Sequence, residues 1–229
     1  MENMLWLIWK ESFSRRRFII GELTFYNDQY IFKYIDPELN DARKEGLDFY
    51  PGFGDLKKEY ISKTLFTNIE SRLPNPSRPD YLSILNTYEL DLNSTKMEIL
   101  AKTKGRLLTD NFEFVPVFDK NKIEFEVAGT RHSLDIQKHK DFFKVNDNLY
   151  LEMEKDNKYD KYAIKVMCDK GDTIYHLGYV PRYYSKKLSD LLNKDISYSA
   201  KIKYLNFESQ LDDEDITVDV KIIFNENWY

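Results

Sequence analysis

Three side chains in one short stretch of the chain could together contact a nucleotide: Asn157, Tyr159 and Asp160. The carboxylate of Asp160 can accept a hydrogen bond from a sugar hydroxyl and would repel a phosphate placed next to it. The ring of Tyr159 offers a flat face to an unpaired base, a contact worth about 1–3 kcal/mol. The amide of Asn157 offers both a donor and an acceptor. Because a terminal nucleotide differs from an internal one by its free hydroxyl and its missing next phosphate, this combination fits the recognition of a nucleic-acid end.

Each of these residues also has a purely structural interpretation. Asn157 and Asp160 are residue types that form turns by binding the nearby backbone with their side chains. Tyr159 and a second tyrosine, Tyr179, could be aromatic residues of the core. The residue types alone leave both interpretations open.

The second half of the chain has the alternating pattern of half-buried strands. Apolar residues occupy every second position from 123 to 127, and the pattern returns at 149–153, 196–202 and 216–222. With the apolar runs at 163–167 and 173–180, it predicts about six strands. One helix is expected from Pro181 onward. Its apolar stripe consists of Tyr184, Leu188, Leu191 and Leu192. Many short strands with one helix favour a small barrel or sandwich, such as a six-stranded, OB-like β-barrel.

This half of the chain resembles the HIRAN domain family. The resemblance rests on three motifs in order: Val127-Ala128-Gly129-Thr130-Arg131, then Asn157-Lys158-Tyr159-Asp160 followed by Ala163-Ile164-Lys165-Val166, and Leu177-Gly178-Tyr179-Val180-Pro181-Arg182 before the expected helix. It implies a small β-barrel related to the OB-fold that binds the 3′ end of single-stranded DNA.

The resemblance also implies further site residues. The family uses a basic residue after the opening glycine, which matches Arg131, and an aromatic residue next, where this chain has His132. An imidazole stacks less extensively than a larger ring, so we expect weaker stacking there. Tyr179 and Arg182 match groups at the pocket edge and on a phosphate. The candidate DNA-binding residues are therefore Arg131, His132, Asn157, Tyr159, Asp160, Tyr179 and Arg182.

The first half of the chain predicts a small antiparallel sheet followed by helices. Apolar and aromatic runs at 5–9, 17–25 and 30–34 predict strands, and Asn27-Asp28 predicts a turn. Helices are expected at 81–88 and at 97–103, the second with a capping box from Thr95 to Glu98. A polar turn at 119–122 separates the halves. We expect an α+β protein with two domains, residues 1–118 and 119–229.

The N-terminal domain more loosely resembles the small N-terminal subdomain of HipA-type toxin kinases. The resemblance rests on the sheet, the segment Leu65-Phe66-Thr67-Asn68 with Leu73-Pro74, the two helices and Gly105. Residues 69–72 interrupt the family's motif, and the HIRAN-like half replaces the kinase core. It implies an alternative role: a regulatory or antitoxin-like subunit that docks a separate HipA-like kinase through residues 1–118.

The charge of the chain limits the size of any nucleic-acid site. The formal net charge is -5, but residues 120–207 contain 17 Lys and Arg against 13 Asp and Glu. Acidic residues follow at once, four of them at 212–215, where a solvated loop is favoured over a cation site. A small basic site is therefore expected, and a broad basic groove is excluded.

Signatures of other function classes are missing from the sequence. It has no phosphate-binding loop, nucleophile elbow, His-Glu-x-x-His motif or kinase signature, so we expect no enzymatic activity and no cofactor. The three histidines lack the spacing of metal ligands. The single cysteine, Cys168, excludes an internal disulfide. No apolar run approaches the roughly 18 residues of a membrane span, so we expect a cytoplasmic protein without a membrane partner.

Overall fold

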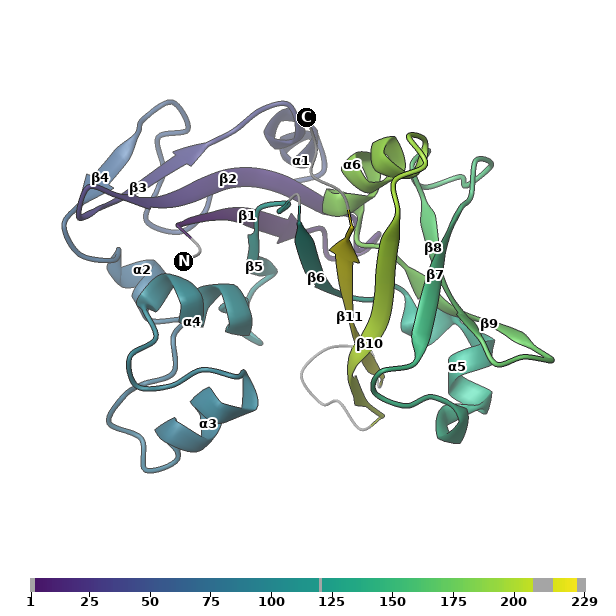
Figure 1. Cartoon of the computed structure of the whole chain (residues 1–229). Helices are drawn as coiled ribbons and strands as arrows, with labels where there is room; N and C mark the ends of the chain where they lie inside the picture. Colours follow the sequence, from purple (N-terminus) through teal and green to yellow (C-terminus); the bar gives the residue numbers. More distant parts are fainter. Residues whose placement is uncertain (1–2, 120, 208–215, 226–229) are drawn as a thin grey trace. The chain divides into compact units, whose positions relative to one another are not determined.

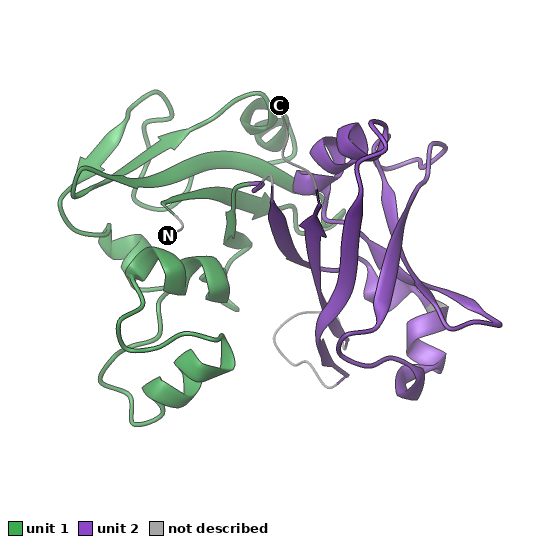
Figure 2. Ribbon diagram, in the orientation of Figure 1, with its two compact units in different colours: residues 1–117 green, residues 118–229 purple. Residues whose placement is uncertain are grey.

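The computed structural model describes residues 3–119, 121–207 and 216–225, so the acidic run at 212–215 lies outside the described residues. The chain forms two compact units, Met1–Val117 and Phe118–Tyr229, which Figure 2 shows in different colours. Both are built on an antiparallel sheet with a few helices, and the expected α+β class is confirmed.

The sheet of the first unit has the strand order β4-β3-β2-β1-β5 and is antiparallel throughout. The three expected strands are present, and Asn27 and Asp28 form the turn between β2 and β3 with positive φ angles of 49° and 57°. Two further strands, β4 and β5, extend the sheet on either side. Pro116 ends β5 at the edge of the sheet, where a residue without an N–H is tolerated. The strands are β1 (Met4–Lys10), β2 (Arg17–Tyr26), β3 (Gln29–Tyr34), β4 (Tyr60–Ser62) and β5 (Phe112–Pro116).

Four helices belong to the first unit, two of which the sequence predicts. In α4 the predicted capping box is present: the Thr95 side chain accepts from the Glu98 N–H, and the Glu98 carboxylate accepts from the Thr95 N–H. Of the apolar residues expected on α3, Leu85 is buried but Leu82 is half exposed. The helices are α1 (Glu38–Lys44), α2 (Thr67–Glu70), α3 (Tyr81–Thr87) and α4 (Lys96–Thr103).

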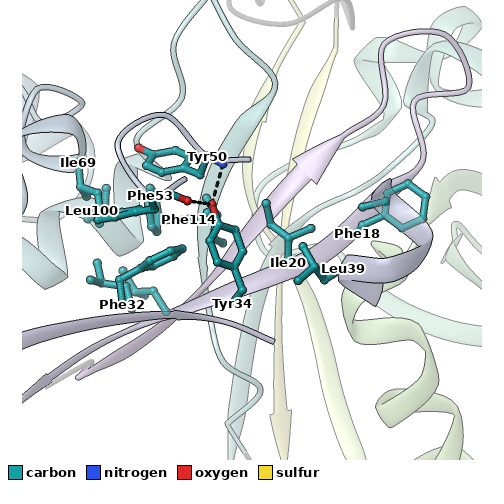
Figure 3. Packing of buried hydrophobic residues seen from close by; sticks show 14 of the residues in the cluster. Phe18, Ile20, Phe32, Tyr34, Leu39, Tyr50, Phe53, Ile69, Leu100 and Phe114 are labelled. Atoms are coloured by element: carbon teal, nitrogen blue, oxygen red, sulfur yellow. Dashed lines mark hydrogen bonds between the residues drawn. The ribbon is translucent and has the colours of Figure 1, made fainter. Parts of the chain in front are cut away.

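An aromatic core holds the sheet against α1, α2 and α4 (Figure 3). Phe32 stacks on Phe53 with ring centroids 4.3 Å apart. The hydroxyl of Tyr34 donates to the Phe53 carbonyl oxygen at 2.7 Å and accepts from the Tyr50 N–H at 2.8 Å, so this buried polar group is satisfied. Arg72 is also buried, paired with Asp110. The core therefore includes polar groups, each with a partner.

The second unit is a curled six-stranded antiparallel sheet with the order β6-β11-β10-β7-β8-β9 (Figure 1). Apolar side chains of β6, among them Ile123 and Phe125, are buried, as the alternation predicts. All six expected strands are present. They are β6 (Lys122–Glu126), β7 (Asn148–Met153), β8 (Ile164–Asp169), β9 (Ile174–Tyr179), β10 (Tyr198–Asn206) and β11 (Thr217–Phe224).

The first and last strands of this sheet meet. Just beyond β6, Ala128 forms an antiparallel bridge with Tyr179 at the end of β9, with both N–H···O distances at 2.8 Å. Gly178 has a φ of +141° and lies against the Ala128 carbonyl, where a side chain would collide. The contact curls the sheet toward a barrel, as the OB-like prediction requires.

Within residues 121–207 and 216–225, the second unit contains two α-helices, one more than the sequence predicts. The predicted helix is α6 (Arg182–Leu192), whose residues Tyr184 and Leu188 are buried. The other is α5 (Leu134–Lys138), which the Ser133 side chain caps. Five residues are too few to show a helical period in the sequence. Short 3-10 turns flank α5, at Thr130–His132 and Lys140–Phe142.

Candidate nucleic-acid interface

The loop at residues 154–163 joins β7 to β8 and contains three of the predicted site residues. Asn157 organises it: its side-chain oxygen accepts from the N–H groups of Tyr159 at 2.9 Å and Asp160 at 3.0 Å. Its side-chain nitrogen donates to the Glu154 carboxylate at 2.6 Å. Both polar groups of Asn157 are thus used inside the loop, which supports the structural interpretation of this residue.

Glu154 ties the loop to the neighbouring strands. Its carboxylate accepts from the ammonium group of Lys165 on β8 at 3.0 Å and from the hydroxyl of Tyr179 on β9 at 3.1 Å. The hydrogen bond from Asn157, followed by those from Lys165 and Tyr179, lowers the pKa of Glu154 against the effect of its partial burial. Burial and the hydrogen bond to Glu154 raise the pKa of Tyr179. Sequence reasoning missed Glu154, although it holds Asn157 and Tyr179 together.

Asp160 fastens the same loop to α6. One carboxylate oxygen accepts from the hydroxyl of buried Ser185 at 2.6 Å, and the other accepts from the Tyr162 N–H at 2.9 Å. An ionised carboxylate has about four acceptor positions, so it can accept further hydrogen bonds after these two. The structural and functional interpretations of Asp160 are therefore compatible.

Tyr159 is 85% exposed, so the interpretation as a core aromatic is wrong for this residue. Its N–H is held by Asn157, and its ring stands in solvent next to Asp160. In the isolated chain, no described residue covers this ring. Burying or stacking such a large apolar surface against another group is energetically favourable. The exposed ring and the half-buried carboxylate are consecutive residues on a loop that hydrogen bonds hold in place.

The bridge between Ala128 and Tyr179 brings the first motif, residues 127–131, to the end of β9. Next to Ala128, Gly129 has a φ of 76° and begins the 3-10 turn that carries the predicted site residues Arg131 and His132. The guanidinium of Arg131 donates to the imidazole of His132 at 2.9 Å, and His132 is exposed.

The two remaining predicted residues lie on either side of Pro181. Tyr179 is half-buried, and its ring meets that of His176 edge-on with centroids 4.9 Å apart. Arg182 is the first residue of α6, three positions before Ser185. The structure thus links Asn157, Asp160 and Tyr179 through hydrogen bonds, and chain connectivity places Arg182 next to them.

Ser133, Asp135 and His176 lie together without the geometry of a catalytic triad. Ser133 and Asp135 both contact His176, but through its backbone carbonyl and N–H rather than through its ring. The His176 ring faces the Gly178 carbonyl, and burial lowers its pKa. Cys168 is buried, which raises its pKa to about 11 and keeps it as a thiol.

Two further classes of site are missing from the residues that the structure describes. None of their His, Cys, Asp and Glu side chains gather in a group of three or more that could hold a metal ion. None of the helices in these same ranges is long and apolar enough to cross a membrane.

Among solved structures, two crystal structures are similar to part of this chain. The HIRAN domain of human HLTF is 19% identical, with a TM-score of 0.35, over 45% of this chain and 74% of that one. A protein from Lactobacillus plantarum is 21% identical, with a TM-score of 0.37, over 45% of this chain and 90% of that one. The search of curated proteins found no match. None of the comparisons supports a resemblance of residues 1–118 to HipA-type kinases.

The family comparison identifies the second unit. The family model of the HIRAN domain matches residues 120–222, which include all three motifs of the sequence resemblance and all seven candidate site residues. The resemblance of this part of the chain to the HIRAN domain family is therefore confirmed.

Proposed function

We propose that this protein binds the 3′ end of single-stranded DNA through its HIRAN domain. Membership of the family supports a role in DNA binding. The observation that carries the finer proposal is the pair Tyr159 and Asp160. An 85% exposed ring stands next to a carboxylate that Ser185 and the loop backbone hold in place.

The two side chains would divide the recognition between them. The terminal base stacks on Tyr159, and the free 3′ hydroxyl donates to the Asp160 carboxylate. A strand that continued past this point would bring a phosphate against the same carboxylate and be repelled. Because hydrogen bonds already order the loop, little conformational entropy is lost when the strand binds.

Recognition of an end is consistent with the modest positive charge of residues 120–207, which hold 17 Lys and Arg against 13 Asp and Glu. A long groove needs many Lys and Arg along the backbone, whereas an end site needs only a few phosphate contacts. Arg131 and Arg182 are the candidates for such contacts in the proposed site. His132 would supply a smaller stacking surface than a larger aromatic ring.

We also propose that the protein acts by binding, without catalysis, and in the cytoplasm. The backbone contacts of Ser133 and Asp135 with His176 support the first point, because a catalytic triad requires contacts through the imidazole ring. The only cysteine is a buried thiol, which is compatible with a reducing compartment.

Fluorescence polarisation with labelled single strands of one sequence tests the proposal. The strands end in a 3′ hydroxyl or a 3′ phosphate, and each is titrated with the unmodified protein and with Asp160→Asn. The amide keeps an oxygen for the Ser185 hydroxyl but loses the charge, so the preference for the free hydroxyl should shrink by about tenfold or more. Equal binding of both strands by the unmodified protein would rule out end recognition.

A further inference from the structure

Two lysines flank the hydrogen bond between Asp160 and Ser185. Lys161 follows Asp160 in the loop, and Lys186 follows Ser185 on α6. Their ammonium groups converge on one aromatic ring, that of Tyr162: the Lys161 nitrogen lies 4.9 Å from the ring centroid and the Lys186 nitrogen 6.0 Å. The contact that fastens the loop to the helix therefore brings two positive charges to the ring of Tyr162.

Unlike Lys165 and Lys203 of the same unit, these two lysines have no carboxylate partner in the part of the chain that the structure describes. Lys165 pairs with Glu154 at 3.0 Å, and Lys203 pairs with Glu124 at 2.9 Å. Among the residues that the structure describes, neither Lys161 nor Lys186 has an Asp or Glu oxygen within 4.0 Å. Both ammonium groups instead make cation–π contacts with the Tyr162 ring.

Two ammonium groups near one ring repel each other, and the face of the ring compensates each only in part. An anion between them would remove the repulsion and accept hydrogen bonds from both. A phosphodiester suits such a place because its two free oxygens can each accept from a different ammonium group. Carboxylates are abundant in this chain, whose net charge is -5, yet no described carboxylate forms an ion pair with either lysine.

We propose that Lys161 and Lys186 together hold one backbone phosphate of a bound single strand, beside the ring of Tyr162. This inference rests on the proposed function, since the strand in question is the one that ends at Tyr159 and Asp160. A strand that ends in a free 3′ hydroxyl has all its phosphates on the 5′ side of the terminal nucleotide. The lysine pair therefore marks where the strand leaves the end site, along the side of the loop that faces α6.

The salt dependence of binding by the full chain tests this site. Affinities for strands with a 3′ hydroxyl and with a 3′ phosphate are measured over a series of salt concentrations for Lys161→Gln, Lys186→Gln and the double variant. Loss of one phosphate contact from a single strand lowers the slope of log K against log salt by about 0.7. Because both lysines hold the same phosphate, the double variant should lose little more than either single variant.

Lys187→Gln is the matched control. Lys187 is an exposed lysine on the same helix, one position further, but its ammonium group lies over the ring of Phe118, 5.2 Å from the centroid, rather than over Tyr162. Removal of its charge should leave the salt slope unchanged.

The outcomes separate this inference from the proposed function. A lower slope with the preference for the 3′ hydroxyl intact supports both. If the preference is present but the double variant keeps the full slope, or loses about twice the slope of either single variant, the shared phosphate site is wrong and end recognition stands. A lower slope in a protein that binds both ends equally supports the phosphate site and contradicts end recognition. A protein that binds neither strand contradicts both.

Discussion

Gly178 approaches Ala128 so closely that a Cβ atom at position 178 would lie 2.6 Å from the Ala128 carbonyl oxygen. The φ of Gly178, +141°, is also one that other residues rarely adopt. The next residue, Tyr179, forms the bridge with Ala128 that joins the ends of the curled sheet. A residue without a side chain is thus required where the sheet closes, and the closure brings the segment with Arg131 toward Tyr179.

We predict that Gly178→Ala destabilises the protein strongly. The backbone conformation alone should cost about 1–3 kcal/mol, and the collision with the Ala128 carbonyl adds to that cost. Urea denaturation measures the free energy of unfolding. Gly171→Ala is the control, because Gly171 also has a positive φ, +88°, but nothing lies within 4 Å of its added Cβ. Equal losses in the two variants would show that the close approach to Ala128 is unimportant.

We predict that Ser185→Ala weakens DNA binding without removing the preference for a 3′ hydroxyl. The variant deletes the hydroxyl that donates to Asp160 at 2.6 Å but leaves the carboxylate in place. Loss of one hydrogen bond to a charged group costs about 1.5–3 kcal/mol, part of which should appear as a less ordered loop and a lower affinity. Fluorescence polarisation with the two strand ends measures both effects. If Ser185→Ala abolished the preference as completely as Asp160→Asn, Asp160 would act by positioning the loop rather than by accepting the terminal hydroxyl.

The lowered pKa of Glu154 predicts that the stability of the protein declines at acidic pH. Its hydrogen bonds lower its pKa in the folded protein below the ordinary value of 4.5. Such a group contributes stability that is present above the pKa of the unfolded chain and is lost as the pH falls through the folded pKa. We therefore expect Glu154→Gln to lower the free energy of unfolding at neutral pH and to flatten its decline below about pH 4.5.

Urea denaturation between about pH 3 and pH 7 checks this expectation. Glu152→Gln serves as the control, since Glu152 also faces Lys165 but at 3.8 Å and on a side chain that is 52% exposed. The control should keep the decline that Glu154 causes. If the free energy of unfolding fell as steeply at acidic pH in Glu154→Gln as in the unmodified protein, Glu154 would not be the cause of the decline.

Local patterns predicted nine of the eleven described strands and the loop residues, because alternation and turn-forming residues are visible within a few positions. Ile123 and Phe125 are buried as the alternation indicates, and Thr95 caps α4 as its spacing from Glu98 indicates. The contacts that assemble the site join distant positions, however. Glu154 and Tyr179 are 25 positions apart, which no local pattern records.

The same separation explains the other residues that sequence reasoning missed. Asp160 and Ser185 are likewise 25 positions apart, and the convergence of Lys161 and Lys186 depends on that contact. Only the folded sheet, with α6 and the turn between β7 and β8 at the same end, places them together (Figure 1). The helix α5 was missed for a different reason, because a helix of five residues shows little more than one turn of periodicity.

We predict that Tyr159→Ala lowers the affinity for single-stranded DNA and leaves the preference for the free 3′ hydroxyl intact. Its ring is 85% exposed, so truncation removes no core packing and should barely change the free energy of unfolding. The loss of one stacked base costs about 1–3 kcal/mol, roughly five- to hundredfold in affinity. Tyr26→Ala is the control, an exposed tyrosine of the first unit that is 64% accessible, and it should bind as the unmodified protein does. If Tyr159→Ala and Tyr26→Ala bound equally well, the terminal base would not stack on Tyr159, and the proposed site would have to lie elsewhere on the domain.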